Sequence, residues 1–128
     1  MEPKSWQQTS VAKIGLREDG IIYVRIEPGQ DQPVAAAQEN VSVCKQLSNG
    51  NRRPLLVDLR GAMVLTPETR LVYADPDLAH HFCKLAMVIS QDPISRMMIN
   101  LYLRTAQIGL PMKVFSTVPK AADWLLEK

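Results

Sequence analysis

Apolar residues recur along the chain in five short runs that have the length of β-strands. The runs VAKIGL (11–16) and IIYVRI (21–26) alternate in polarity and are separated by the turn sequence Arg-Glu-Asp-Gly, so they predict a hairpin. The runs LLVDL (55–59), KLAMVI (84–89) and MKVFS (112–116) each follow one helical pattern and lead into another. This alternation predicts parallel strands joined by crossover helices.

Prolines mark the starts of the predicted helices. Five of the nine prolines stand where a helix could begin, and proline suits the first helical position because its missing N–H would be unpaired there anyway. In three of these places the preceding residue, Thr66, Asp75 or Asp92, has a side-chain oxygen that can cap the helix. The predicted helices span residues 33–48, 67–83, 93–108 and 119–127, with a break in the second at Asp75-Pro76.

The order of these elements, ββαβαβαβα, predicts a single α/β domain over residues 11–128. Its sheet is expected to have five strands, mostly parallel, with the hairpin at the N-terminus. Polar residues at alternate strand positions, such as Arg25, Asp58 and Lys113, indicate that the helices cover mainly one face. Residues 1–10 are predicted to form a flexible tail, on which Trp6 is the one aromatic side chain.

Composition argues against several classes of function. The chain has 128 residues and a net charge of +2, with its lysines and arginines scattered, which offers little attraction to nucleic acid or acidic membranes. No apolar run approaches the ~20 residues of a membrane span, and the start lacks the apolar core of a signal peptide. A cytoplasmic protein is therefore expected, with Cys44 and Cys83 reduced and unpaired.

Motifs of common enzymes are absent from the sequence. The glycines are isolated, and GxGxxG, GxSxG and HExxH do not occur, which argues against dinucleotide-binding enzymes, P-loop ATPases, elbow-type serine hydrolases and zincins. Asp77 with His81, or His80 with Cys83, could supply two metal ligands, but a polar helix edge explains these residues equally simply. We predict no metal, no cofactor and no enzymatic activity.

Polar residues follow the predicted parallel strands at their carboxyl ends, where such sheets place their sites. This edge is predicted to carry Asp58, Arg60, Thr66, Ser90, Gln91, Asp92, Ser116 and Thr117. Acid–base catalysis by Asp58 and Asp92 is one reading of this edge. Helix capping, together with pairing of Asp58 to a loop N–H or to Arg60, is a second, and a binding face for a partner is a third.

Four segments carry a resemblance to a known family: LLVDLRG with its capped helix start, LAMVIS, DPISRMMINLYLRT and MKVFSTVPKAADWLLEK. Together with the element order, they resemble the STAS domain, the family of sulfate transporters and anti-sigma-factor antagonists. The bacterial subgroup labelled SpoIIAA-like or STAS/SEC14-like is the more similar one. The resemblance covers roughly residues 12–127 and implies a non-enzymatic regulator or scaffold that acts through protein contacts.

The resemblance also locates a missing switch. In the anti-sigma antagonists, the strand matching 55–59 leads to an Asp-Ser-Ser-Gly loop in which a kinase phosphorylates one serine. This chain has Thr66-Pro67-Glu68-Thr69 at that place, so the usual phosphoacceptor is absent. The related CRAL-TRIO proteins suggest an alternative function, a carrier of a small apolar or lipid-like ligand.

The helix predicted at 93–108 is more apolar than a helix on one face of a sheet requires. Its polar residues gather into one narrow stripe, formed by Arg96, Asn100, Arg104 and Gln107. The remaining apolar arc must be covered by neighbouring helices, by a ligand or by another chain. We predict a homodimer with Ile99, Tyr102 and Leu103 at or near the interface, while a buried pocket under this helix would favour the ligand carrier.

Overall fold

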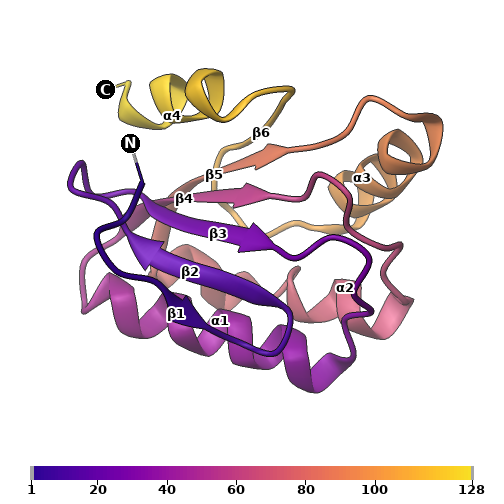
Figure 1. Ribbon diagram of the computed structural model, residues 1–128, viewed down its shortest axis with the longest axis horizontal. Helices are drawn as coiled ribbons and strands as arrows, with labels where there is room; N and C mark the ends of the chain where they lie inside the picture. Colours follow the sequence, from indigo (N-terminus) through magenta and orange to yellow (C-terminus); the bar gives the residue numbers. More distant parts are fainter. Residues whose placement is uncertain (1, 128) are drawn as a thin grey trace.

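The computed structural model describes residues 2–127 and contains a mixed sheet with helices on both faces (Figure 1). Its strands are β1 (Gln7–Gln8), β2 (Ala12–Leu16), β3 (Ile22–Ile26), β4 (Arg53–Asp58), β5 (Phe82–Val88) and β6 (Met112–Phe115). Its helices are α1 (Val34–Ser48), α2 (Pro67–Val72), the 3-10 helix η1 (Pro76–His80), α3 (Pro93–Thr105) and α4 (Val118–Leu126).

The strands lie in the sheet in their order along the chain, β1 to β6. The pairings β1–β2 and β2–β3 are antiparallel, and the three pairings from β3 to β6 are parallel. In a sheet of this order, crossovers of the same hand place all their helices on the same face. The α/β class, the hairpin and the parallel strands predicted from the sequence are confirmed, while the sheet has six strands rather than five.

The helices divide between the two faces as this topology requires. One core cluster joins the sheet to α1, η1 and α3, with Cys44, Leu78 and Ile99 among its members. A second, smaller cluster on the other face joins Tyr23 and Leu56 to α4, which Figure 1 shows across the sheet from α1. The helices α1, η1 and α3 therefore lie on one face of the sheet, and α4 lies on the other. None of the helices within residues 2–127 has the length and apolar character needed to span a membrane.

The N-terminal segment is the clearest correction to the sequence-based prediction. Residues 2–10 are not a loose tail, since Gln7–Gln8 pair with β2 and both Pro3 and Thr9 are buried. A side chain on Gly15 would place its Cβ 2.5 Å from Cβ of Pro3, so only glycine lets this segment cross the strand so closely. The segment has no apolar periodicity, and pattern analysis could not detect a two-residue strand.

The region predicted as one helix at 67–83 is interrupted at the expected place. The α-helix α2 ends at Val72, η1 starts at Pro76 on the cap of Asp75, and β5 already begins at Phe82. The Asp75 carboxylate accepts the backbone N–H of Asp77 over 2.9 Å. This capped restart stabilises the break, and the chain enters β5 two residues earlier than its apolar pattern indicated.

Candidate functional site

The strand-end residues predicted as a catalytic or binding edge begin with Asp58, the last residue of β4. The Asp58 carboxylate is buried and accepts two bonds from the Arg60 guanidinium, from Nε at 2.9 Å and from a terminal nitrogen at 2.7 Å. It also accepts the backbone N–H of Arg60 over 3.1 Å. The side-chain bonds between the two residues raise the pKa of the Arg60 guanidinium. The carboxylate is thus held in a bidentate pair that shapes the loop after β4.

Helix capping occupies three more of the predicted residues. Thr66 accepts the N–H of Thr69 at the start of α2, Asp92 accepts that of Ser95 at α3, and Thr117 accepts that of Lys120 at α4. The bond from Ser95 lowers the pKa of the Asp92 carboxyl. The helix-capping role considered for these residues is therefore confirmed. A binding surface for a partner at this edge of the sheet stays a prediction.

The remaining residues of the predicted edge are also placed by the structure. Ser90 accepts the backbone N–H of Gly61 over 3.3 Å, which joins the ends of β4 and β5. Gln91 accepts a bond from Arg96 over 2.7 Å, and Ser116 is exposed after β6. The first bond joins two loops and the second stays within the start of α3.

The candidate metal ligands lie in an ordinary ion-pair arrangement. Asp77 accepts a bond from Lys45 over 2.7 Å and lies 3.5 Å from Nε2 of His81. Across residues 2–127, no three histidine, cysteine or acidic side chains gather in a way that could hold a metal ion. Cys44 and Cys83 are both free thiols, and burial raises the pKa of the Cys44 thiol to about 12.

A cavity of about 100 Å³ lies between the sheet and the helices of the larger core. Its floor is formed by inward-facing residues of β3, β4 and β5, including Leu55, Val57 and Met87, and its other walls come from α1, α2, η1 and the loop after β4. Met98 and Ile99 of α3 complete the enclosure. The surface that these walls present to the cavity is entirely apolar.

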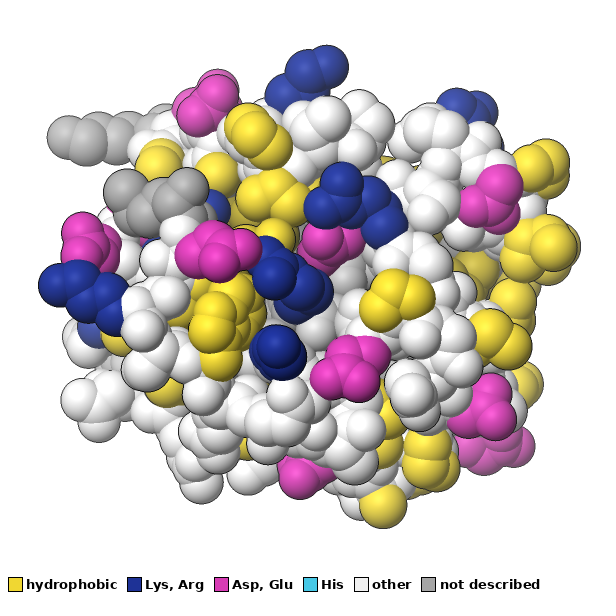
Figure 2. Space-filling model, viewed as in Figure 1, with side chains coloured by type: hydrophobic (Ala, Val, Ile, Leu, Met, Phe, Trp, Pro, Cys, Tyr) yellow, Lys and Arg dark blue, Asp and Glu magenta, His cyan; other side chains and the backbone are white. Residues whose placement is uncertain are grey.

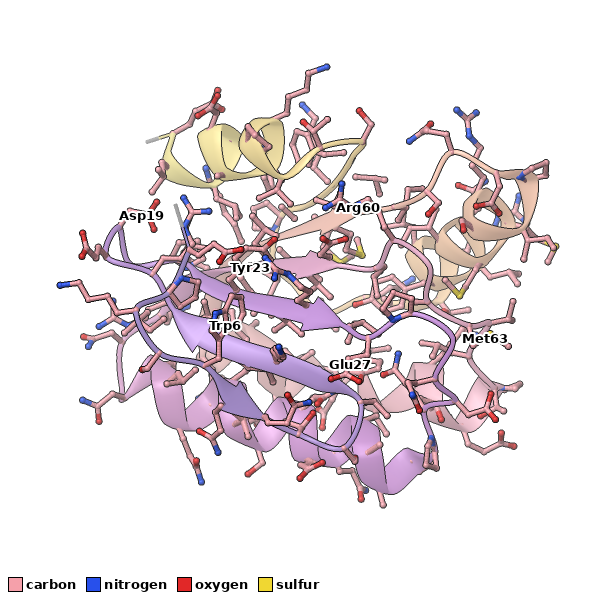
Figure 3. The ribbon with its side chains drawn as sticks, in the orientation of Figure 1. Trp6, Asp19, Tyr23, Glu27, Arg60 and Met63 are labelled. Atoms are coloured by element: carbon pink, nitrogen blue, oxygen red, sulfur yellow. The ribbon has the colours of Figure 1, made fainter. Side chains whose placement is uncertain are left out.

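The cavity reaches solvent beside the loop between β4 and α2. Met63 of this loop lines the cavity and is 45% exposed, and Figure 3 places it at the side of the molecule where α3 lies. Val57 is only half-buried although it belongs to an inner strand of the sheet. Since Val57 also lines the cavity, its exposed surface indicates that this partly open space is wide enough for a water-sized molecule.

A chain of buried hydrogen bonds runs along one wall of the cavity. The Thr9 hydroxyl donates to Oδ1 of Asn40 over 2.7 Å, and Nδ2 of Asn40 donates to the Tyr73 hydroxyl over 3.1 Å. The Tyr73 hydroxyl in turn donates to Oε1 of Gln32 over 2.6 Å. Asn40, Tyr73 and Gln32 all line the cavity.

The chain ends on an unpaired donor. Nε2 of Gln32 is buried and has no hydrogen-bond partner among the residues that the structure describes. The backbone carbonyl of Gln32 accepts a bond from the Thr69 hydroxyl over 2.8 Å, which fixes the residue against α2. Native structures rarely leave a buried polar group unpaired, so this amide is an unusual feature of the wall.

The tyrosines of this wall stay protonated over the whole neutral range. Burial raises the pKa of Tyr73 to about 12, and burial also raises the pKa of Tyr102. The Tyr102 hydroxyl donates to the backbone carbonyl of Tyr73 over 2.8 Å. This bond ties α3 to the end of α2, so the helix that closes the cavity is anchored to the wall that carries the hydrogen-bond chain.

The sequence-based interpretation missed this cavity and its polar wall. One signal was available, because Asn40 falls on the stripe of its helix that also contains Ala36, Ala37, Val43 and Cys44. A polar residue inside an apolar stripe indicates a buried hydrogen bond. The empty space itself has no sequence signal, since the residues around it are ordinary core residues.

The predicted interface on α3 needs correction. Ile99 and Tyr102 are only 5% and 8% exposed and face the cavity side, so they cannot be the contact surface of a second chain. Leu103 is exposed, as expected, and so are three further apolar residues of the helix: Ile94, Met97 and Leu101. Figure 2 shows hydrophobic side chains along the edge of the molecule where α3 lies. The dimer itself stays a prediction.

The family described as "Domain of unknown function (DUF7793)" matches residues 15–128. The chain belongs to this DUF7793 family. No curated protein and no solved structure matches the chain. The matched region of the DUF7793 domain includes every residue that lines the cavity, from Val24 to Tyr102. The resemblance to STAS domains stays a prediction.

Proposed function

We propose that this DUF7793 domain binds a small apolar molecule in the cavity beneath α3. The observation that supports the proposal is the cavity itself, an apolar space that is open to solvent beside the loop after β4. Protein cores are packed to the density of organic crystals, so a solvent-accessible space within a core is unusual. A pocket beneath this helix is also the feature that the sequence analysis associated with a ligand carrier.

The size of the cavity limits the ligand. Drug-sized ligands occupy pockets of roughly 300–1,000 Å³, whereas an engineered cavity of about 150 Å³ binds benzene. At about 100 Å³ the cavity suits a molecule on the order of five or six heavy atoms, or one end of a longer chain. Met63, Met87 and Met98 line it, and their flexible side chains allow the walls to adjust to a guest.

These methionines provide a direct test. In protein carrying 13C-labelled methionine methyl groups, saturation with benzene should shift the NMR signals of Met63, Met87 and Met98. Met97 and Met112 do not line the cavity and serve as internal controls. Signals that do not respond to benzene, or that all shift equally, would contradict binding in the cavity.

A second candidate function, regulation through protein contacts, is favoured by the outer surface of α3. Ile94, Met97, Leu101 and Leu103 are between 37% and 60% exposed, and such patches often mark contact sites. In this proposal a second copy of the chain or a partner protein covers the helix. The double variant Met97→Asp/Leu101→Asp should stay folded and sediment as a monomer at a concentration where the wild type sediments as a dimer. A wild-type protein that sediments as a monomer at high micromolar concentration would contradict the proposed dimer.

The two candidates are compatible, since α3 separates the cavity from the exposed patch. Met98 and Ile99 face inward and Met97 faces outward on consecutive positions of the helix. A ligand that moves the inner side chains therefore acts on the same helix that carries the outer surface. No phosphorylation is proposed at the start of α2, where Thr66 is a helix cap and the Thr69 hydroxyl is buried.

A further inference from the structure

The outer side of α3 carries two arginines that no acidic residue balances. Arg96 and Arg104 are both exposed, and neither forms an ion pair with a carboxylate among residues 2–127. The helix itself contains no aspartate or glutamate. Asp92, the nearest acid in the sequence, accepts bonds from the backbone N–H and the hydroxyl of Ser95. Both arginines therefore remain available to a charged group from outside the domain.

The same side of α3 exposes apolar side chains. Met97 and Leu101 are 54% and 38% exposed, and with Pro93, Asn100 and the two arginines they border a shallow hollow on the outside of the helix. Figure 1 shows α3 at one side of the molecule, where Figure 2 shows hydrophobic side chains along the edge. Exposed apolar patches of this kind often mark contact sites. The outer face of α3 is thus both apolar and cationic.

The order of side chains around the helix favours a protein over a lipid surface. At about 100° per residue, Asn100 and Arg104 fall between Met97 and Leu103, near the middle of the exposed arc. Insertion of the apolar side chains into lipid would carry an amide and a guanidinium with them, whereas helices that lie on membranes keep such groups on the opposite face. A protein partner can place acceptors opposite both groups.

We infer that α3 binds an acidic amphipathic helix of a partner protein. This inference rests on the second candidate function, regulation through protein contacts, and specifies the class of partner. The spacing of Arg96 and Arg104 along the helix axis is about 12 Å. A partner helix with two carboxylates at this spacing, and apolar residues between them, would pair with both arginines and cover Met97 and Leu101.

A second copy of the chain fits this face less well. In an antiparallel pair of α3 helices centred on Asn100, each Arg96 would face Arg104 of the other copy. The two contacts between like charges would oppose this dimer, whereas an acidic partner in the same arrangement would replace both of them by ion pairs.

The chain itself can supply an acidic partner for the test. The variant Arg96→Glu/Arg104→Glu keeps the apolar residues of the face and presents two carboxylates at the required spacing. Sedimentation of the wild type mixed with this variant should show a heterodimer that is at least about tenfold tighter than the self-association of either protein. Added salt should weaken this heterodimer. The matched control is Lys113→Glu/Lys120→Glu, which makes the same change in net charge at exposed positions outside α3 and should not associate with the wild type.

The outcomes separate this inference from the candidate function on which it rests. A mixture that associates no more tightly than the wild type alone would overturn the inference. If the wild type nevertheless dimerises and Met97→Asp/Leu101→Asp abolishes the dimer, a second copy covers α3 and regulation through protein contacts stands. If the wild type instead co-sediments with phosphatidylglycerol vesicles, a lipid surface is the occupant and the inference is overturned. If no association is found in any of these experiments, the contact function fails together with the inference.

A second measurement uses the wild type and does not depend on the variant being folded. A synthetic peptide of residues 93–105 that carries the same two glutamate substitutions should shift the side-chain 15N–1H signals of Arg96 and Arg104. The peptide with the native sequence should leave these signals in place. Equal responses to the two peptides would overturn the inference.

Discussion

Filling the cavity with one additional methylene group should stabilise the protein and weaken ligand binding. Val57→Ile is the best substitution for this purpose, because Val57 is half-buried on β4 with its side chain lining the cavity, and isoleucine keeps the β-branched form that strands prefer. Burial of a CH2 group contributes about 0.8 kcal/mol, and ordering of the additional torsion offsets up to about 0.5 kcal/mol of this. The free energy of unfolding should therefore rise by roughly 0.3–0.8 kcal/mol.

The assay is urea unfolding of the wild type, Val57→Ile and a matched control, Val114→Ile. Val57, Met87 and Val114 are partners in neighbouring strands and form one row across the sheet, but Val114 does not line the cavity. Val114→Ile should show little increase in the free energy of unfolding, and the affinity for benzene should fall in Val57→Ile alone. If Val57→Ile instead lowers the free energy of unfolding by about 1 kcal/mol or more, the added methylene group has no room in the core. That result would refute the existence of the cavity.

Three further predictions concern the supports of the cavity. Thr66→Ala should lower the stability by about 1 kcal/mol in urea unfolding through loss of the α2 cap, and Thr66→Ser should leave it nearly unchanged. Between pH 10 and about 12 the unfolded chain releases the Tyr73 proton and the folded chain retains it, so stability should fall over this range, and less steeply in Tyr73→Phe. Gly15→Ala should displace the N-terminal segment from β2, visible as faster amide hydrogen exchange at Gln7 and Gln8; unchanged exchange would contradict the close approach of Pro3.

Much of the fold was predictable because local sequence and topology agree. The turn between the hairpin strands, the proline helix starts and the apolar runs each specify an element, and the structure has them within a few residues of the predicted bounds. Thr66, Asp75 and Asp92 are caps as predicted, and the break before Pro76 is present. The Asp58–Arg60 pair was foreseen as one alternative for that carboxylate.

The features that could not be predicted depend on contacts between distant segments. Thr9, Asn40 and Tyr73 come from three separate parts of the chain, and their hydrogen bonds exist only after the N-terminal segment has packed on α1. The burial of Ile99 and the exposure of Met97 also depend on which side of α3 packs on the core. Helical periodicity placed both residues on one wide apolar arc and could not say which side faces inward.

The proposed binding function depends on the space beneath α3, and a crystal exposed to xenon gas under pressure would test for this space most directly. Xenon is apolar and occupies cavities of this kind. We predict one well-occupied xenon site in contact with Val57, Met87 and Ile99. Crystals in which side chains fill this space, or in which xenon binds elsewhere and leaves it empty, would contradict a cavity beneath α3.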